Sequence, residues 1–131
     1  MLIELDFQSD IPIYMQLVHA IIEGIATGEL KPGDKLPPVR TLAADLGVNM
    51  LTVNKAYQHL KQLGFIQIHR KKGAVINSEE IRKADDKFYK RLFASLRPLA
   101  MESVCRHLTK SQFLTLCSEI FEEIELKGGK C

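Results

Sequence analysis

The residues best suited to chemistry lie in one segment, 50–62, which reads MLTVNKAYQHLKQ. At about 100° per residue, the period of an α-helix, its apolar residues fall on one side. These are Val53, Ala56, Tyr57 and Leu60. The opposite side carries amides, a lysine and one leucine but no acid: Leu51, Asn54, Lys55, Gln58 and Gln62. Such side chains contact base edges and phosphates in the major groove of DNA. A solvated helix face would also be polar, so the neighbouring segments decide between the two interpretations.

A short turn before this helix favours the DNA interpretation. Gly47 can adopt the positive φ that ends a helix, and Asn49 can cap the next helix by accepting a backbone N–H. Two helices joined by a short turn with Gly are typical of a helix-turn-helix, whose second helix enters the major groove by its N-terminal end. The residues at that end are Asn49, Met50, Leu51, Thr52, Asn54 and Lys55.

The charge of the chain is concentrated in the same region. Residues 46–78 contain five Lys or Arg and no Asp or Glu, so their net charge is +5, whereas the whole chain carries only +2. A local excess of positive charge is typical of a surface that faces phosphates.

Two short strands are predicted at residues 65–69 and 74–77, where apolar residues alternate. The tip between them is basic and consists of Arg70, Lys71, Lys72 and Gly73. A hairpin of two strands is not stable alone, so it must pack on the helices and project its tip as a wing.

The segment 12–76 resembles the winged helix-turn-helix domain of the GntR transcriptional regulators. The matching motifs are PIYMQL at 12–17, GELKPGDKLPPVRTLA at 28–43, LGVN at 46–49 and TVNKAYQHLKQLGFI at 52–66. The resemblance implies that Arg40 contacts a phosphate or a base. The chain has Pro38 where the family usually has Ser, and Lys71 where the family wing commonly has Gly.

The composition changes after residue 77, and we predict two domains, 1–77 and 78–131. Asn77 with Glu80, or Ser78, is expected to cap a new helix, and Thr109 with Gln112 forms a capping box for a last one. Pro98 is expected to kink the first of these helices near residues 94–96. Both carry apolar stripes, which include Phe88, Leu92, Leu96, Leu99, Phe113, Leu116, Ile120, Phe121 and Ile124.

Two helices with so much apolar surface cannot bury it against each other alone. A second copy of the chain is the simplest partner, since two-fold dimers are the commonest oligomers. Resemblance to the short, YtrA-like branch of the GntR family likewise implies a helical dimerisation tail. The alternative is that the two helices pack back on the winged domain of the same chain.

Other chemistry receives little support. The three cysteines have neither disulfide-scaffold nor zinc spacing, and the acids from Glu119 to Glu125 belong to a polar helix face. No phosphate loop or catalytic triad is present, and no stretch is apolar enough to span a membrane or to act as a signal peptide. We therefore expect a cytoplasmic, non-enzymatic protein with no cofactor, metal or membrane partner.

The predicted fold class is mainly α with a small β-hairpin, namely a winged helix-turn-helix domain plus a C-terminal helical dimerisation tail. The predicted function is a dimeric transcriptional regulator, by preference a repressor, that binds double-stranded DNA at a palindromic operator. The alternative is a winged-helix module that binds a protein through Met50 and Leu51. A small-molecule effector stays open.

The predicted contacts divide by type. Bases would be read by Asn49, Leu51, Asn54 and Gln58, with Leu51 against a thymine methyl. Phosphates would be held by Arg40, Thr52 and Lys55, and the backbone or minor groove beside the wing by Arg70, Lys71 and Lys72.

Overall fold

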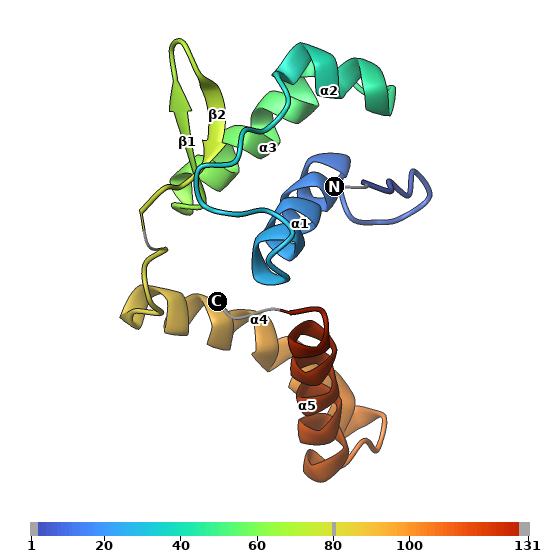
Figure 1. The fold of residues 1–131 in the computed structure, drawn as a ribbon. Coiled ribbons are helices and arrows are strands. Elements are labelled where there is room, and N and C mark those ends of the chain that lie inside the picture. The colour runs from blue at the N-terminus through green and yellow to red at the C-terminus, as the bar shows by residue number, and fades with distance from the viewer. Residues whose placement is uncertain (1–2, 80, 129–131) are drawn as a thin grey trace. The chain divides into compact units, whose positions relative to one another are not determined.

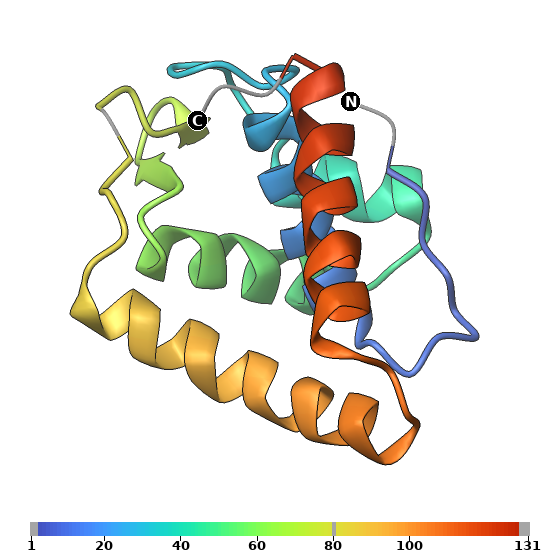
Figure 2. The ribbon, with the colours of Figure 1, turned by 90° about the horizontal axis from the view of Figure 1, so that it is seen from below.

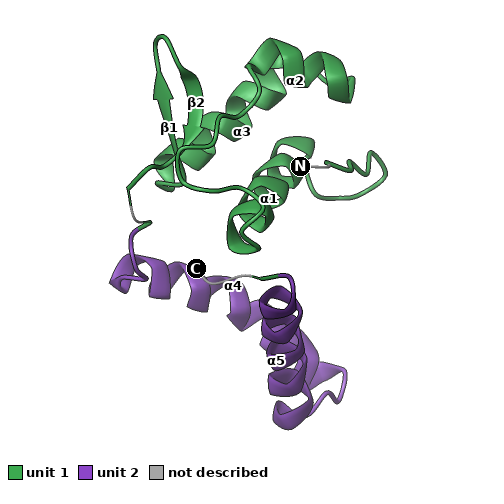
Figure 3. Cartoon of the chain, in the orientation of Figure 1, with its two compact units in different colours: residues 1–81, 128–131 green, residues 82–127 purple. Residues whose placement is uncertain are grey.

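The computed structural model describes residues 3–79 and 81–128. The described chain divides into two compact units (Figure 3). The first comprises the residues up to Ile81 together with Gly128, and the second spans Arg82–Lys127. The division falls after Ile81 because this side chain packs against the hydrophobic core of the first unit.

The first unit contains three helices and a hairpin, in the order α1 (Ile13–Ala26), α2 (Val39–Leu46), α3 (Met50–Gln62), β1 (Ile66–His69) and β2 (Gly73–Ile76) (Figure 1). Helices α1 and α2 both pack on α3. The core forms where their apolar stripes meet, and its largest fully buried side chains are Tyr57, Leu17, Ile21, Leu60, Ile76, Val18 and Val53. The apolar side predicted for residues 50–62 therefore lies in the core.

The turn between α2 and α3 has the predicted geometry. Gly47 adopts a left-handed conformation, with φ of 68°, directly after α2. The side chain of Asn49 accepts a hydrogen bond of 2.7 Å from the backbone N–H of Leu51 and so caps α3. These two residues fix where one helix ends and the next begins.

The hairpin is antiparallel, with Ile66 opposite Ile76 and His69 opposite Gly73. Three residues connect the strands, and Gly73 follows them with φ of 73°, an arrangement common in three-residue hairpin loops. A third extended segment, residues 33–36, also pairs with β2, which the sequence did not predict. The Leu36 N–H donates to Ala74 O, and the Ile76 N–H donates to Asp34 O. This pairing covers β2 and explains why Ala74, Val75 and Ile76 are all buried instead of alternating.

The second unit consists of α4 (Asp86–Cys105) and α5 (Lys110–Leu126), two helices joined by a short turn (Figure 2). Thr109 and Gln112 form the predicted capping box at the start of α5. Helix α4 continues through Pro98 as one element. The turn after α4 holds His107 at φ of 63°, the only residue other than glycine with positive φ in the described ranges.

The expected start of α4 near Ser78 is wrong. The helix begins at Asp86, and the Asp85 side chain caps it by accepting the Phe88 N–H. The Asn77 side chain instead donates to Gly64 O and accepts from the Glu79 N–H, which ties it to the first unit. Glu80, the other expected capping residue, lies outside the described residues.

Candidate DNA-binding surface

Helix α3 has the two predicted faces. On one side Val53, Ala56 and Leu60 have no exposed surface and Tyr57 is 2% exposed. On the other side Asn54, Lys55 and Gln58 are exposed, and Leu51 is 76% exposed. Single exposed leucines are common on protein surfaces, so it is the position of Leu51 near the N-terminal end of α3, and not its exposure alone, that makes it a candidate for an apolar base contact.

The N-terminal end of α3 presents a mixed set of groups. Met50 is 45% exposed, and Thr52 is partly buried. Asn49 is exposed, but its side-chain oxygen Oδ1 already accepts a hydrogen bond from the Leu51 N–H. The side-chain N–H₂ group is therefore the part left for a ligand. Asn49 can thus act toward DNA as a donor while it caps the helix.

Helix α2 is positioned by a hydrogen bond from the buried face of α3. The Tyr57 hydroxyl donates to the backbone oxygen of Pro37 over 2.6 Å, just before α2 begins. Burial raises the pKa of Tyr57 from 10.0 to about 12, so the hydroxyl keeps its proton and remains a donor. Arg40, exposed in the first turn of α2, lies three residues after the oxygen that this bond fixes.

Lys55 lies at the side of α3 that adjoins α1. Its ammonium nitrogen is 4.1 Å from the centroid of the Tyr14 ring, a cation–π contact. The ring of Tyr14 also meets that of His59 in a T-shaped arrangement, with centroids 6.3 Å apart. Tyr14 itself is half-buried and packs at the edge of the core.

The hairpin rises from the C-terminal end of α3 and carries the basic tip (Figure 1). Arg70, Lys71, Lys72 and Gly73 are all exposed. Among the described residues none of the three cations has an ion pair, so their charge is available to an anionic partner.

Comparison with known proteins identifies the family. The protein-family model described as "Bacterial regulatory proteins, gntR family" matches residues 13–76. The HTH-type transcriptional repressor YtrA of Bacillus subtilis is 42% identical over 76 residues, which are 58% of each chain. The structure of YtrA from Sulfolobus acidocaldarius, a GntR-family transcription factor, is 46% identical with a TM-score of 0.62 and covers 77% of this chain and 98% of its own. The chain belongs to the GntR family.

Two further solved structures extend the likeness of this GntR chain. A transcriptional antiterminator from Listeria monocytogenes EGD-e is 27% identical, has a TM-score of 0.87 and covers 95% of this chain and 92% of its own. The DNA-binding domain of AraR, solved in complex with operator ORX1, is 26% identical with a TM-score of 0.52 and covers 56% of this chain and 95% of its own. The curated relatives are matched over only part of their length, 58% in the case of the Bacillus repressor.

The helices of the second unit of the GntR chain leave their apolar side chains largely exposed. None of the described residues of α4 or α5 is buried. Of the nine residues expected at a dimer interface, Phe113 and Ile124 are partly buried. The other seven are exposed, namely Phe88, Leu92, Leu96, Leu99, Leu116, Ile120 and Phe121. Exposed apolar side chains in this number are typical of an interaction site.

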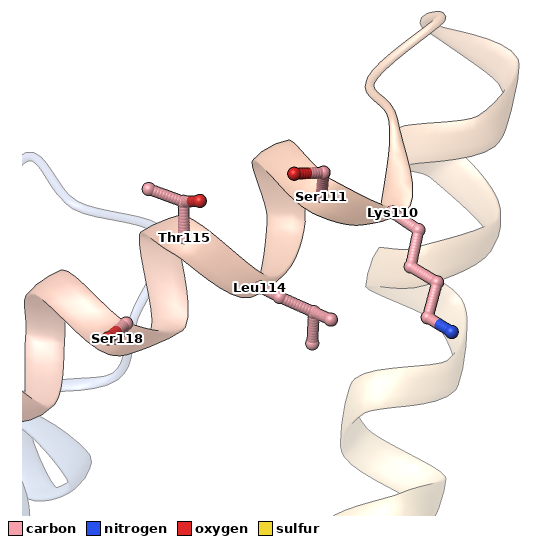
Figure 4. A pocket seen from close by; sticks show the side chains of 5 residues that line it. All are labelled: Lys110, Ser111, Leu114, Thr115 and Ser118. Atoms are coloured by element: carbon pink, nitrogen blue, oxygen red, sulfur yellow. The ribbon is translucent and has the colours of Figure 1, made fainter.

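A shallow hollow of about 440 Å³ lies along one side of α5 (Figure 4). It is lined by Lys110, Ser111, Leu114, Thr115 and Ser118, all from this helix. Small-molecule sites are usually enclosed by several elements, so this one-sided hollow resembles part of an interface more than an effector pocket.

No group of three or more His, Cys, Asp or Glu able to hold a metal ion occurs within residues 3–79 and 81–128. Over the same ranges, none of the helices is both long enough and apolar enough to cross a bilayer.

Proposed function

We propose that this GntR protein is a sequence-specific, DNA-binding transcriptional regulator. The observation that carries the proposal is the exposed face of α3, which is free of acids and ends beside a basic hairpin. The face presents amides and one leucine to bases, while the wing presents three cations to phosphates. The similar AraR domain was solved in complex with an operator, which supports DNA as the partner.

The base-reading residues in this proposal are Asn49, Leu51, Asn54 and Gln58. Phosphates are held by Arg40, Thr52 and Lys55, and the wing residues Arg70, Lys71 and Lys72 follow the backbone or the minor groove. Met50 and Gly73 flank these sets and approach the duplex with them. Acting on DNA, the protein would work in the cytoplasm, and the named Bacillus relative favours repression over activation.

A homodimer on a palindromic operator completes the proposal. The apolar stripes of α4 and α5 leave much surface uncovered within the chain, and a second copy supplies a self-complementary cover. Two winged units then read half-sites about one helical turn apart.

Selection of bound fragments from a random pool of duplex DNA tests the proposal. We expect an enriched palindrome whose affinity falls steeply with salt, because counterions are released from several phosphates. Retention of no duplex at low ionic strength would refute it. Capture of a protein through Met50 and Leu51, without salt-dependent DNA binding, would favour the interaction module instead.

Arg40→Ala tests the phosphate contact of α2. We expect weaker binding to all sequences alike and a salt slope reduced by about 1, because a phosphate contact carries no sequence information. Binding assays of the selected and a scrambled duplex measure both effects. Unchanged affinity would remove Arg40 from the contact surface.

A further inference from the structure

Tyr14 belongs to α1 and lies at the edge of the exposed face of α3. Its ring lies under the Lys55 ammonium at 4.1 Å and meets the His59 ring edge-on at 6.3 Å. Lys55 and His59 are four residues apart and so lie on the same side of α3. His59 of α3 therefore holds the Tyr14 ring of α1 in place, and the ring in turn holds the Lys55 ammonium of α3.

The contact restricts a side chain that is otherwise very mobile. A lysine has four rotatable bonds and loses much rotamer freedom when its ammonium is fixed by a ligand. Within the described part of the chain Lys55 has no ion pair, so the Tyr14 ring is the group that restrains it. The ring faces only one side of the ammonium group, so the N–H groups on the other side stay available to an anion.

We propose that Tyr14 is a positioning residue, which holds the Lys55 ammonium at the α1 side of the exposed face of α3 for contact with a DNA phosphate. This inference rests on the proposed function, since it requires that α3 meets a duplex. It gives α1 a role in DNA recognition, because the Lys55 side chain is already ordered before DNA binds. His59 supports the arrangement by fixing the plane of the ring.

A double-mutant cycle tests the proposal with the full chain and its selected duplex. Tyr14→Phe keeps the ring, and Tyr14→Leu keeps apolar bulk without a ring. We expect Tyr14→Phe to bind as the wild type does and Tyr14→Leu to bind about two- to five-fold more weakly, the range for an exposed cation–π contact. Lys55→Met should lower the salt slope by about 1. In the Lys55→Met background, Tyr14→Leu should then have no further effect.

Three outcomes would overturn the proposal. Additive losses in the double variant would mean that Tyr14 acts on DNA without Lys55. Equal losses for Tyr14→Phe and Tyr14→Leu would exclude the ring as the active feature. Tighter binding by Tyr14→Leu would mean that the ring withholds the cation from DNA.

A measurement without DNA separates this proposal from the proposed function. The Lys55 ammonium nitrogen lies over the ring, so the protons of the adjoining ε-methylene group should resonate upfield in NMR spectra of the wild type and Tyr14→Phe, but not of Tyr14→Leu. Absence of that shift in the wild type would refute the contact itself, whatever the DNA result. Presence of the shift in a chain that binds no duplex would refute the proposed function and the phosphate role together, while the contact stands. Thermal unfolding of each variant checks that the fold is retained.

Discussion

Leu51 is the residue that, in the proposed function, would contribute an apolar contact to the choice of DNA sequence. Its side chain is the most exposed large apolar group among the described residues of the first unit, and it lies in the first turn of α3, where residues of a helix-turn-helix reach base edges. Hydrophobic burial is regained if the side chain covers the C5-methyl group of a thymine. The leucine that is exposed in the free protein would then be covered by one specific base.

Leu51→Ala should relax the preference at one T·A pair of the selected site, by about 1 kcal/mol or more. Repeating the selection with the variant measures the change. Replacing that thymine by uracil, which lacks only the methyl group, should weaken the wild type and leave Leu51→Ala nearly unaffected. An unchanged motif and indifference of the wild type to uracil would contradict the assignment.

Tyr57 makes the stability of the first unit depend on pH in the alkaline range. The folded state raises the pKa of its hydroxyl from 10.0 to about 12 by burial, so folding favours the neutral form. Its contribution to the free energy of unfolding is complete below about pH 10 and is lost as pH rises through about 12. The same hydroxyl donates to Pro37, so its ionisation also removes the bond that fixes the start of α2.

Tyr57→Phe should lower the free energy of unfolding by about 0.5–1.5 kcal/mol at neutral pH, the net value of one hydrogen bond. Denaturant titrations between pH 8 and pH 12 should show this difference shrinking as pH rises, because only the wild type loses the bond. Tyr89→Phe, at an exposed position of α4, serves as the control and should show no such trend. Parallel curves for wild type and Tyr57→Phe would contradict the role of burial.

At the scale of elements, the wing is a charged tip on a small sheet. Its strands are short, and the extended segment 33–36 adds backbone hydrogen bonds to β2 that a two-stranded hairpin would lack. Because these hydrogen bonds stabilise the hairpin, its three-residue tip can consist of cations alone and needs no apolar side chain packed on the core. The tip is therefore suited to phosphate contact, while the strands that carry it supply Ile66, Ala74 and Ile76 to the core.

Lys71→Ala combined with Lys72→Ala should weaken binding to every duplex and reduce the salt slope by about 2, because two phosphate contacts are lost. The selected motif should stay the same. Lys87→Ala combined with Lys90→Ala removes equal charge from exposed positions of α4 and is the matched control. Equal losses in both pairs would show that only net charge matters.

At the scale of the whole molecule, the two units differ in how they bury apolar surface. The first has a closed core, whereas no described residue of α4 or α5 is buried. In the proposed dimer a second copy would supply this burial, and the stability of the second unit would then depend on protein concentration.

Leu92→Glu should place a charge in the proposed dimer interface and shift the chain to a monomer in analytical ultracentrifugation. Binding to the full palindrome should weaken much more than binding to a single half-site, because the linkage of two units is lost. Lys87→Glu, also exposed on α4, is the control for added negative charge. A dimer that persists in Leu92→Glu would exclude this stripe as the interface.

The sequence by itself determined the features that depend on neighbours along the chain. The two faces of α3 follow from helical periodicity, and the caps at Asn49 and Thr109 follow from bonds between residues two or three positions apart. The basic sign of the wing follows from composition. Family motifs extended these local features to the winged fold.

Only the tertiary structure decided the contacts between distant segments. It brought Tyr14 to Lys55, the Tyr57 hydroxyl to Pro37 and residues 33–36 to β2, and it moved the start of α4 to Asp86 by committing Asn77 to Gly64. A single sequence carries no periodic signal for such pairs, because each depends on how whole elements pack. The chemistry of α3 was therefore readable from its residues, while the groups that hold that chemistry in place became visible only in three dimensions.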